Sequence, residues 1–181
     1  MSSDLRVVRT DRVDVDALAD VYRKVHAAEL HLVDHTDPSP EQRLQWTVEA
    51  PGFAAAVALD GDRPIGTVMG CPLPAETLWW RDLTSVSDPA LVREWDGRTF
   101  AVCEAFVLPE YRRQQVGVRM FSDLLASRPE ERVTLAVADT NTAVWRALRM
   151  LKWEHVGDLI PFPGWRPHQM LVRPLPWRPA S

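Results

Sequence analysis

Hydrophobic residues change their spacing once within the stretch from residue 99 to residue 125. Residues 99–108 are almost continuously apolar, which is typical of a strand covered on both faces, and Glu104 is the one charge among them. From Val116 onwards the apolar residues recur at helical spacing. A short basic turn, RRQQVG at residues 112–117, lies between the two. The pattern predicts a buried strand, a turn and a helix that begins on the turn.

This basic turn has the features of an anion-binding site. A helix start offers unpaired backbone N–H groups and the positive end of the helix dipole. Arg112 and Arg113 add side chains that pair with phosphate oxygens in a bidentate manner, and Gly117 lies beside them. We interpret the turn as a cradle for a pyrophosphate. A surface turn with solvated arginines fits the local pattern equally well.

The other elements are predicted from shorter patterns of the same kind. Ser39 and Pro40 open a helix with a capping box, and an Asp-Gly turn at residues 60–61 joins two strands into a hairpin. Residues 71–98 form an irregular insertion, whose adjacent tryptophans are expected to cover the sheet rather than to stack on a ligand, and residues 174–181 form a tail. Further strands are expected near residues 5–8, 133–138, 154–160 and 169–172, and further helices near residues 14–28 and after Asn141.

Composition and charge narrow the classes of protein. A chain of 181 residues suits one domain with a substantial core. Its net charge of −4 argues against a general nucleic-acid or acidic-membrane binder, and it fits a cationic substrate somewhat better. No apolar run is long enough for a transmembrane helix, and the N-terminus does not have the pattern of a signal peptide. Two cysteines are too few for a disulfide framework, so we expect reduced thiols and a cytoplasmic protein.

Two blocks of the sequence resemble motifs of the GNAT superfamily of acyl-CoA-dependent N-acyltransferases. The family pattern V-x-P-x-Y-R, followed by [QR]-x-x-G-x-[GA], has its counterpart in VLPEYRRQQVG at residues 107–117. A strand followed by N-x-x-A-x-x-L-Y-x-x-x-G-F is matched in part by residues 133–153, where Asn141 stands for the asparagine and Trp153 for the aromatic residue. The order of the other elements is compatible with this family.

The resemblance implies an α/β (α+β) fold, in which a mixed central sheet of about six or seven strands carries helices on both faces, within one domain at residues 1–181. It also implies transfer of an acetyl group from acetyl-CoA, as co-substrate, by direct attack of a primary amine of a small molecule or a peptide. The sequence leaves open the acceptor, the acyl chain length and a homodimer. The residues that the resemblance assigns to the cofactor are Val107, Arg112, Arg113, Gln114, Gln115, Val116, Gly117, Val118 and Asn141.

Glu104 is the predicted catalytic base. It is a lone carboxylate in an apolar strand, and burial raises a carboxyl pKa towards a range that is useful for proton transfer. A structural carboxylate paired with a neighbouring arginine is the alternative. The backbone N–H near Val107 is implied as the oxyanion donor, and Cys103 is expected to be a buried thiol on the opposite side of the strand rather than a nucleophile.

Three positions depart from the family pattern. Gln115 replaces the first glycine of the cradle, Leu148 stands where a tyrosine often serves as general acid, and Lys152 replaces the glycine before the aromatic residue. These departures keep a second hypothesis open. In it, the chain is a catalytically degenerate domain that binds acyl-CoA or a protein partner without turnover.

The segment at residues 29–38 is rich in polar side chains. His31 and His35 have a spacing that zinc proteins use, but Leu32 follows the first histidine where the zincin pattern has glutamate. We therefore expect no metal site here. In proteins that resemble this family the segment borders the acceptor pocket, so its side chains are interpreted as substrate contacts.

Overall fold

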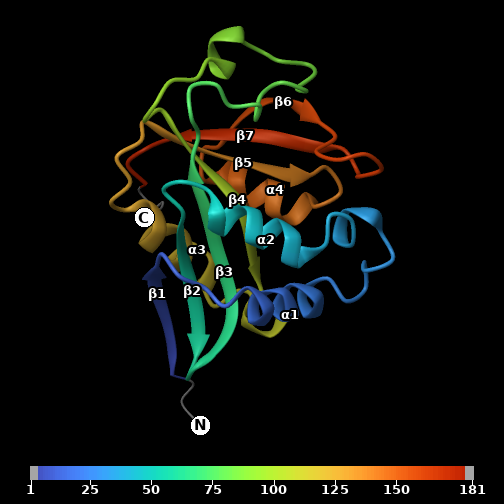
Figure 1. The fold of residues 1–181 in the computed structure, drawn as a ribbon, viewed down its shortest axis with the longest axis vertical. Coiled ribbons are helices and arrows are strands. Elements are labelled where there is room, and N and C mark those ends of the chain that lie inside the picture. Colours follow the sequence, from blue (N-terminus) through green and yellow to red (C-terminus); the bar gives the residue numbers. More distant parts are fainter. Residues whose placement is uncertain (1–3, 178–181) are drawn as a thin grey trace. The chain divides into compact units, whose positions relative to one another are not determined.

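A computed structural model describes residues 4–177, and its elements follow the predicted order (Figure 1). The strands are β1 (Leu5–Thr10), β2 (Ala54–Asp60), β3 (Arg63–Pro72), β4 (Thr99–Val107), β5 (Arg132–Ala138), β6 (Glu154–Leu159) and β7 (His168–Pro174). The α-helices are α1 (Val15–Val25), α2 (Pro40–Glu49), α3 (Val116–Leu125) and α4 (Thr142–Met150). Three short 3₁₀-helices are η1 (Val33–His35), η2 (Pro89–Val92) and η3 (Pro109–Tyr111).

The strands form one mixed sheet of seven strands in the order β1-β2-β3-β4-β5-β7-β6. The pairs β1–β2, β2–β3, β5–β7 and β6–β7 are antiparallel. The pair β4–β5 is parallel, with Thr99–Ala101 opposite Arg132–Thr134. A parallel pair needs a crossover connection, and α3 lies between these two strands in the chain. The predicted mixed α/β sheet of about six or seven strands is confirmed.

The chain divides into two compact units, and the boundary falls within β4. Unit 1 comprises residues 1–71 and 102–127, and unit 2 comprises residues 72–101 and 128–181. Each unit therefore takes segments from distant parts of the sequence. The single domain at residues 1–181 stays a prediction.

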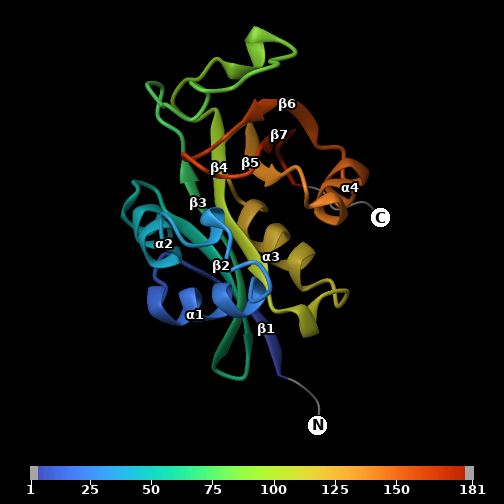
Figure 2. The ribbon, with the colours of Figure 1, turned by 90° about the vertical axis from the view of Figure 1, so that its right-hand side faces the viewer.

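In unit 1 the helices cover both faces of the strands. Helices α1 and α2 pack on each other on one face, and α3 packs on β1 and β2 on the other (Figure 2). Asp14 caps α1, and the predicted capping box at Ser39 and Gln42 opens α2. Because these caps and the apolar stripes behind them are local signals, the sequence predicts these helices well.

In unit 2 the irregular segment is held by Arg132 of β5. The Arg132 guanidinium donates to Thr99 Oγ1 at 2.8 Å and to the Leu91 carbonyl oxygen at 2.7 Å, and its Cζ lies 5.0 Å from the centre of the Trp80 ring. Trp80 is buried, and its Nε1 donates to Glu94 Oε2 at 3.0 Å. Trp80 is thus a packed side chain of unit 2, as the covering role predicts.

The boundaries of two predicted segments shift slightly. Strand β3 continues to Pro72, so the irregular segment begins two residues later than predicted. The predicted tail begins at the last residue of β7, and Trp177 within it is buried, with its ring centre 6.4 Å from that of Trp153. Residues 178–181 of that tail lie outside the described residues. In the described part of the chain, no helix has the length and apolar character to cross a membrane.

Candidate functional site

The first turn of α3 differs from those of the other three α-helices in the described residues in having no side-chain cap. Asp14, Ser39 and Asn141 each accept a hydrogen bond at the start of α1, α2 and α4. At α3 the preceding residue is Gln115, and its side chain makes no such bond. The backbone N–H groups of residues 116–118 thus open α3 without the usual capping oxygen, as an anion site requires.

The backbone before α3 has the conformation that the family glycine favours. Gln115 has φ 58° and ψ 13°, in the left-handed region, and Arg113 has φ 65°. A non-glycine residue there costs about 1–2 kcal/mol. The main chain therefore keeps the left-handed conformation although Gln115 replaces glycine. The replacement adds a side chain and some strain to the turn.

Space is open beside the helix start. A Cβ atom built on Gly117 would meet no atom within 4 Å. The side chains of residues 112–115 are exposed, so Arg112 and Arg113 are accessible at the same turn. The structure brings the predicted residues of the cradle together at one helix start, and their contact with an anion stays a prediction.

Tyr111 of η3 fixes this turn to the β2–β3 hairpin. Its hydroxyl donates to Asp60 Oδ2 at 2.6 Å and accepts from Arg63 Nη2 at 2.9 Å. Arg112 and Arg113 follow directly after this anchored residue. The tyrosine of the motif therefore positions the basic turn through its hydroxyl group.

Glu104 in β4 is paired with Arg43 of α2. Arg43 Nε donates to Glu104 Oε1 at 2.9 Å, and the two side chains are 8% and 12% exposed. Arg43 also donates to the Pro38 carbonyl oxygen at 2.7 Å. Burial raises the pKa of Glu104, and the neighbouring Arg43 opposes part of that rise. The arginine-paired carboxylate expected as the alternative is present, and its pKa is shifted in the direction that a base requires.

Val107 lies where β3 and β4 approach closely. A Cβ on Gly66 would lie 2.5 Å from the Phe106 carbonyl oxygen and 2.9 Å from Val107 Cα, so only glycine fits at that point. Leu108 N donates to the Ile65 carbonyl oxygen at 2.9 Å. These contacts fix the main chain at the end of β4.

Two predicted positions lie in unit 2. Asn141 is the N-cap of α4, where its Oδ1 accepts from Val144 N at 3.4 Å, so its expected cofactor contact stays a prediction. Leu148 of α4 is buried. A buried leucine has no proton to donate, so this position supplies no general acid.

Cys103 lies next to Glu104 and also faces α2. A hydrogen bond with the Cys71 thiol, together with burial, raises the pKa of the Cys103 thiol, and the Thr47 hydroxyl of α2 opposes the rise. The expectation that Cys103 lies on the opposite side of the strand from Glu104 stays a prediction. Cys71 and Cys103 are not joined in a disulfide bond.

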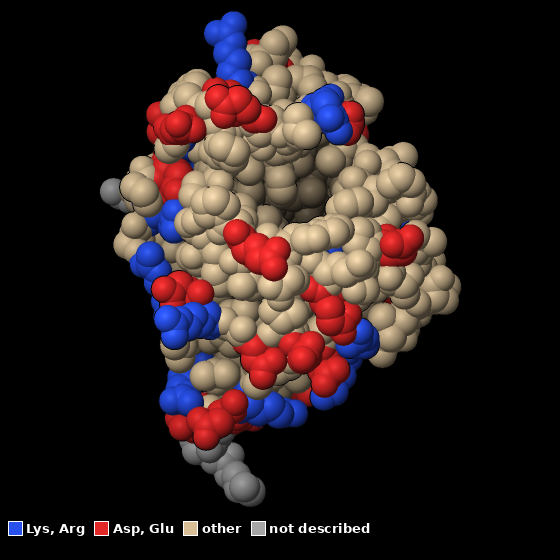
Figure 3. All heavy atoms as spheres, in the orientation of Figure 1, with Lys and Arg blue, Asp and Glu red and all other residues tan. Residues whose placement is uncertain are grey.

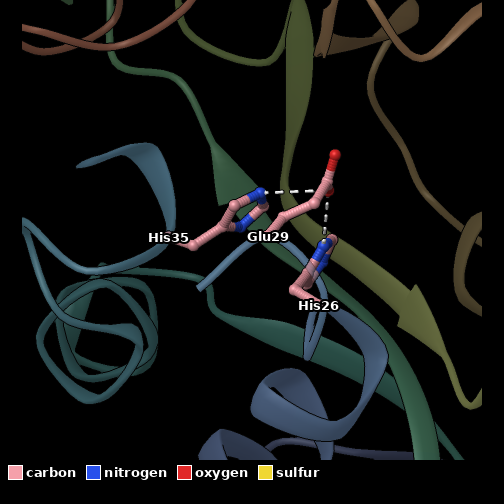
Figure 4. A group of neighbouring side chains, drawn as sticks. All are labelled: His26, Glu29 and His35. Carbon is pink, nitrogen blue, oxygen red and sulfur yellow. Dashed lines mark ion pairs between the residues drawn. The ribbon is translucent and has the colours of Figure 1, made fainter. Parts of the chain in front are cut away.

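The connection between α1 and α2 gathers side chains around Glu29 (Figure 4). His35 is buried, and its Nδ1 lies 2.7 Å from the Tyr22 hydroxyl oxygen. His26 and His35 both turn towards the Glu29 carboxylate. Burial and the nearby His35 lower the pKa of His26 to about 4, so at neutral pH its contact with Glu29 is not between two charges. His31 is exposed and lies outside the group.

A family model described as "Acetyltransferase (GNAT) family" matches residues 17–152. The chain belongs to this family. The predicted family membership is therefore confirmed. No curated protein matches the chain significantly.

Solved GNAT structures share the fold at low sequence identity. Arabidopsis thaliana NAA60 in complex with acetyl-CoA has a TM-score of 0.63 and 14% identity, covering 94% of this chain and 99% of that chain. An aminoglycoside 6'-N-acetyltransferase complexed with coenzyme A has a TM-score of 0.61 and 16% identity, covering 97% and 99%. An acetyltransferase from Thermus thermophilus has a TM-score of 0.63 and 15% identity, covering 94% and 97%. The expectation of acetyl-CoA as co-substrate agrees with the ligands of the first two.

Several residues of this region are not identifiable from the sequence alone. Arg43 belongs to no recognised motif, although an arginine on the buried side of α2 is a signal for a buried carboxylate partner. Tyr22 lies in the helix predicted near residues 14–28, and its contact with His35 has no signal in the sequence. His26 and Glu29 belong to no recognised motif, because the turns that bring them to His35 are irregular.

Replacing Arg43 by methionine tests the buried ion pair. Arg43→Met is expected to lower the free energy of unfolding by about 3–5 kcal/mol at neutral pH, because Glu104 is left buried without a counter-ion. Without Arg43 the folded-state pKa of Glu104 lies further above its unfolded value. Stability is then greatest below the unfolded pKa and is lost as the pH rises through the folded pKa, so the deficit relative to wild type grows with pH.

Urea unfolding of both proteins across the acidic to neutral range measures this deficit. Arg23→Met on α1 is the matched control, because Arg23 is 42% exposed and pairs with Glu41 at the surface. Its loss should stay within about 1 kcal/mol. A deficit for Arg43→Met that does not change with pH would show that Glu104 is not the group that Arg43 balances.

Replacing Gln115 by glycine tests the strained turn. Gln115→Gly is expected to raise the free energy of unfolding by roughly 0.5–1 kcal/mol, because glycine adopts a positive φ without steric cost. Gln115→Ala removes the same side chain and keeps the strain, so it should give no gain. Thermal or urea unfolding compares the three proteins. A glycine variant no more stable than the alanine variant would contradict the left-handed conformation.

Proposed function

We propose that this protein transfers an acetyl group from acetyl-CoA to a primary amine of a small molecule or a peptide. The observation that carries the proposal is the start of α3. There an uncapped helix N-terminus, a left-handed backbone at Gln115 and open space at Gly117 coincide with the motif of the family. These features suit an anion that approaches the main chain closely.

The pyrophosphate of the cofactor would be held by this turn. The backbone N–H groups of Val116, Gly117 and Val118 point out of an uncapped helix start, and Arg112 and Arg113 add positive charge. Gln114 donates from Nε2 to the Glu110 carbonyl oxygen at 3.0 Å, which ties the turn to η3. The backbone N–H near Val107 is assigned to the developing negative charge on the thioester oxygen.

Glu104 is assigned as the general base. Acetyl-CoA supplies the acyl group as a thioester. The amine nitrogen forms a bond to the carbonyl carbon, the C–S bond breaks with its electron pair going to sulfur, and the amine proton passes to Glu104. Arg43 engages Oε1, and a carboxylate accepts at both oxygens. A thiol has a pKa of about 8.5, so the thiolate leaves without a dedicated acid at Leu148.

The protonation state of the thiols favours direct attack of the amine on the thioester, without an acyl-cysteine intermediate. The nucleophilic form of cysteine is the thiolate. The pKa of Cys103 is raised by its hydrogen bond with Cys71 and by burial, so the group remains a protonated thiol. Cys103 is therefore a poor acyl acceptor despite its place beside Glu104.

Acidic side chains favour a cationic acceptor. Red side chains gather over α1 and α2 in Figure 3. Asp14, Asp16, Glu41 and Glu49 line a shallow pocket together with the exposed Trp46. Acidic groups raise the local concentration of protonated amines, and an exposed tryptophan attracts a cation to its ring face. The aminoglycoside acetyltransferase among the structural neighbours is in line with the small-molecule class.

Replacing Arg113 by alanine tests the cradle. Arg113→Ala is expected to weaken the binding of CoA by about tenfold, because one charge-assisted contact to phosphate is lost. Arg12→Ala is the control, because Arg12 is an exposed arginine of the same unit outside the turn. Isothermal titration gives the dissociation constants. Equal affinity in the two variants would remove Arg113 from the phosphate site.

Replacing Glu104 by glutamine tests the base. Glu104→Gln is expected to lower turnover of an accepted amine by about 10²–10⁴-fold while CoA affinity is unchanged. Because the base acts in its deprotonated form, wild-type kcat/KM rises with pH through the pKa of Glu104, and the variant should lack that rise. Asp123→Asn, an exposed carboxylate of α3, is the control. Full turnover by the glutamine variant across the pH range would refute the assignment.

A further inference from the structure

A group of potential metal ligands lies in the connection between α1 and α2. Among residues 4–177 the group comprises His26, Glu29 and His35, and one ligand atom from each lies within 4.8 Å of the others. Figure 4 shows both imidazole rings turned towards the Glu29 carboxylate, with an ion-pair contact drawn from each ring to it. The sequence predicts no metal here, because Leu32 follows His31 where the zincin pattern has glutamate, and no pattern connects His35 with His26.

Successive turns bring the three residues together. His26 is the C-cap of α1, and its N–H donates to the Tyr22 carbonyl oxygen at 3.0 Å. Glu29 N then donates to the His26 carbonyl oxygen at 2.8 Å, and Leu32 N donates to the Glu29 carbonyl oxygen at 2.9 Å. Helix η1 follows and carries His35 at its end. Hydrogen-bonded backbone, rather than free loop, therefore sets the positions of these side chains.

The spacing of the ligand atoms suits a small divalent ion. Glu29 Oε2 lies 3.3 Å from His35 Nε2 and 3.7 Å from His26 Nδ1. Atoms held about 2.0–2.2 Å from a tetrahedral ion lie about 3.3–3.6 Å from one another. Both distances to the carboxylate oxygen are thus close to the values of a bound state. The two imidazole nitrogens lie within 4.8 Å of each other, and rotation of the side chains would bring them to the same spacing.

The second nitrogen of His35 is already engaged. Nδ1 lies 2.7 Å from the Tyr22 hydroxyl oxygen, which leaves Nε2 facing Glu29. Tyr22 is 6% exposed, and its ring packs edge-on against Phe106 at 5.4 Å. A partner of this kind, held rigidly behind a histidine, orients the ring of metal ligands in proteins.

We propose that His26, Glu29 and His35 bind a divalent transition-metal ion of the zinc class, with Tyr22 orienting His35. Two imidazole nitrogens and one carboxylate oxygen suit such an ion, whereas Mg²⁺ and Ca²⁺ prefer sites made of oxygen atoms. Three protein ligands leave a fourth coordination position open. The Glu29 side chain is 46% exposed, so this position is accessible to water or to a small ligand from solution.

The proposal does not rest on the proposed acetyl transfer, because none of its ligands is assigned to the cradle or to the base. A network of charged side chains without a metal ion is the alternative interpretation of this group. In that case Glu29 would pair with protonated histidines, and the protein would show no specific affinity for zinc.

Isothermal titration of Zn²⁺ into the chelator-treated, tag-free protein tests the proposal. One saturable site is expected, together with a tetrahedral-type visible spectrum when Co²⁺ is used and no binding of Mg²⁺. Failure of the wild-type protein to bind Zn²⁺ would overturn the site.

Variants locate the bound ion. Glu29→Gln and His26→Gln should each weaken Zn²⁺ binding by more than about 100-fold, and Tyr22→Phe should weaken it by about 10–100-fold. His31→Gln is the matched control, since it removes an exposed histidine of the same segment and should leave the affinity unchanged. Glu29 is half-exposed, so its variant should fold even if substitution of the buried His35 does not. Unchanged affinity in Glu29→Gln and His26→Gln would mean an adventitious ion only and would overturn the proposal.

Discussion

The packing of unit 1 depends on the buried ion pair of Arg43 and Glu104. A carboxylate in an apolar strand is costly to bury, and a partner that is itself buried makes it tolerable. The pair joins α2 to β4 across 61 positions of sequence. The Arg43 guanidinium also lies over the Tyr22 ring, with Cζ 4.9 Å from the ring centre, and the Tyr22 hydroxyl reaches His35. A continuous set of contacts thus links the assigned base to the proposed metal site.

The start of α3 shows how main-chain geometry can persist when a motif residue changes. Gln115 retains the left-handed conformation that glycine favours, and Tyr111 holds the turn from the other side through Asp60 and Arg63. A phosphate site of this type relies on backbone N–H groups, which every residue except proline supplies. The replacement of glycine by Gln115 therefore adds strain and a side chain to the turn, and it leaves the backbone N–H donors in place.

The helices and strands that the sequence predicts correctly depend on local signals. The capping box at Ser39, the Asp-Gly hairpin turn and the change of hydrophobic period after β4 each lie within a few residues, and each gives the observed element. Glu104 is identifiable because a charge in an apolar run stands out. Its partner Arg43 is not, because the pairing depends on how α2 packs against β4. The grouping of His26, Glu29 and His35 is hidden for a similar reason, since irregular turns have no sequence period.

The most direct test of this account is isothermal titration of the purified protein with acetyl-CoA and, separately, with CoA. Saturable binding of both ligands is expected, because the pyrophosphate that they share is the group assigned to the start of α3. Binding would also justify a screen of amines for turnover. Absence of binding at millimolar cofactor would contradict this assignment. Gln115 would then block the cradle, and the domain would bind a protein partner instead of the cofactor.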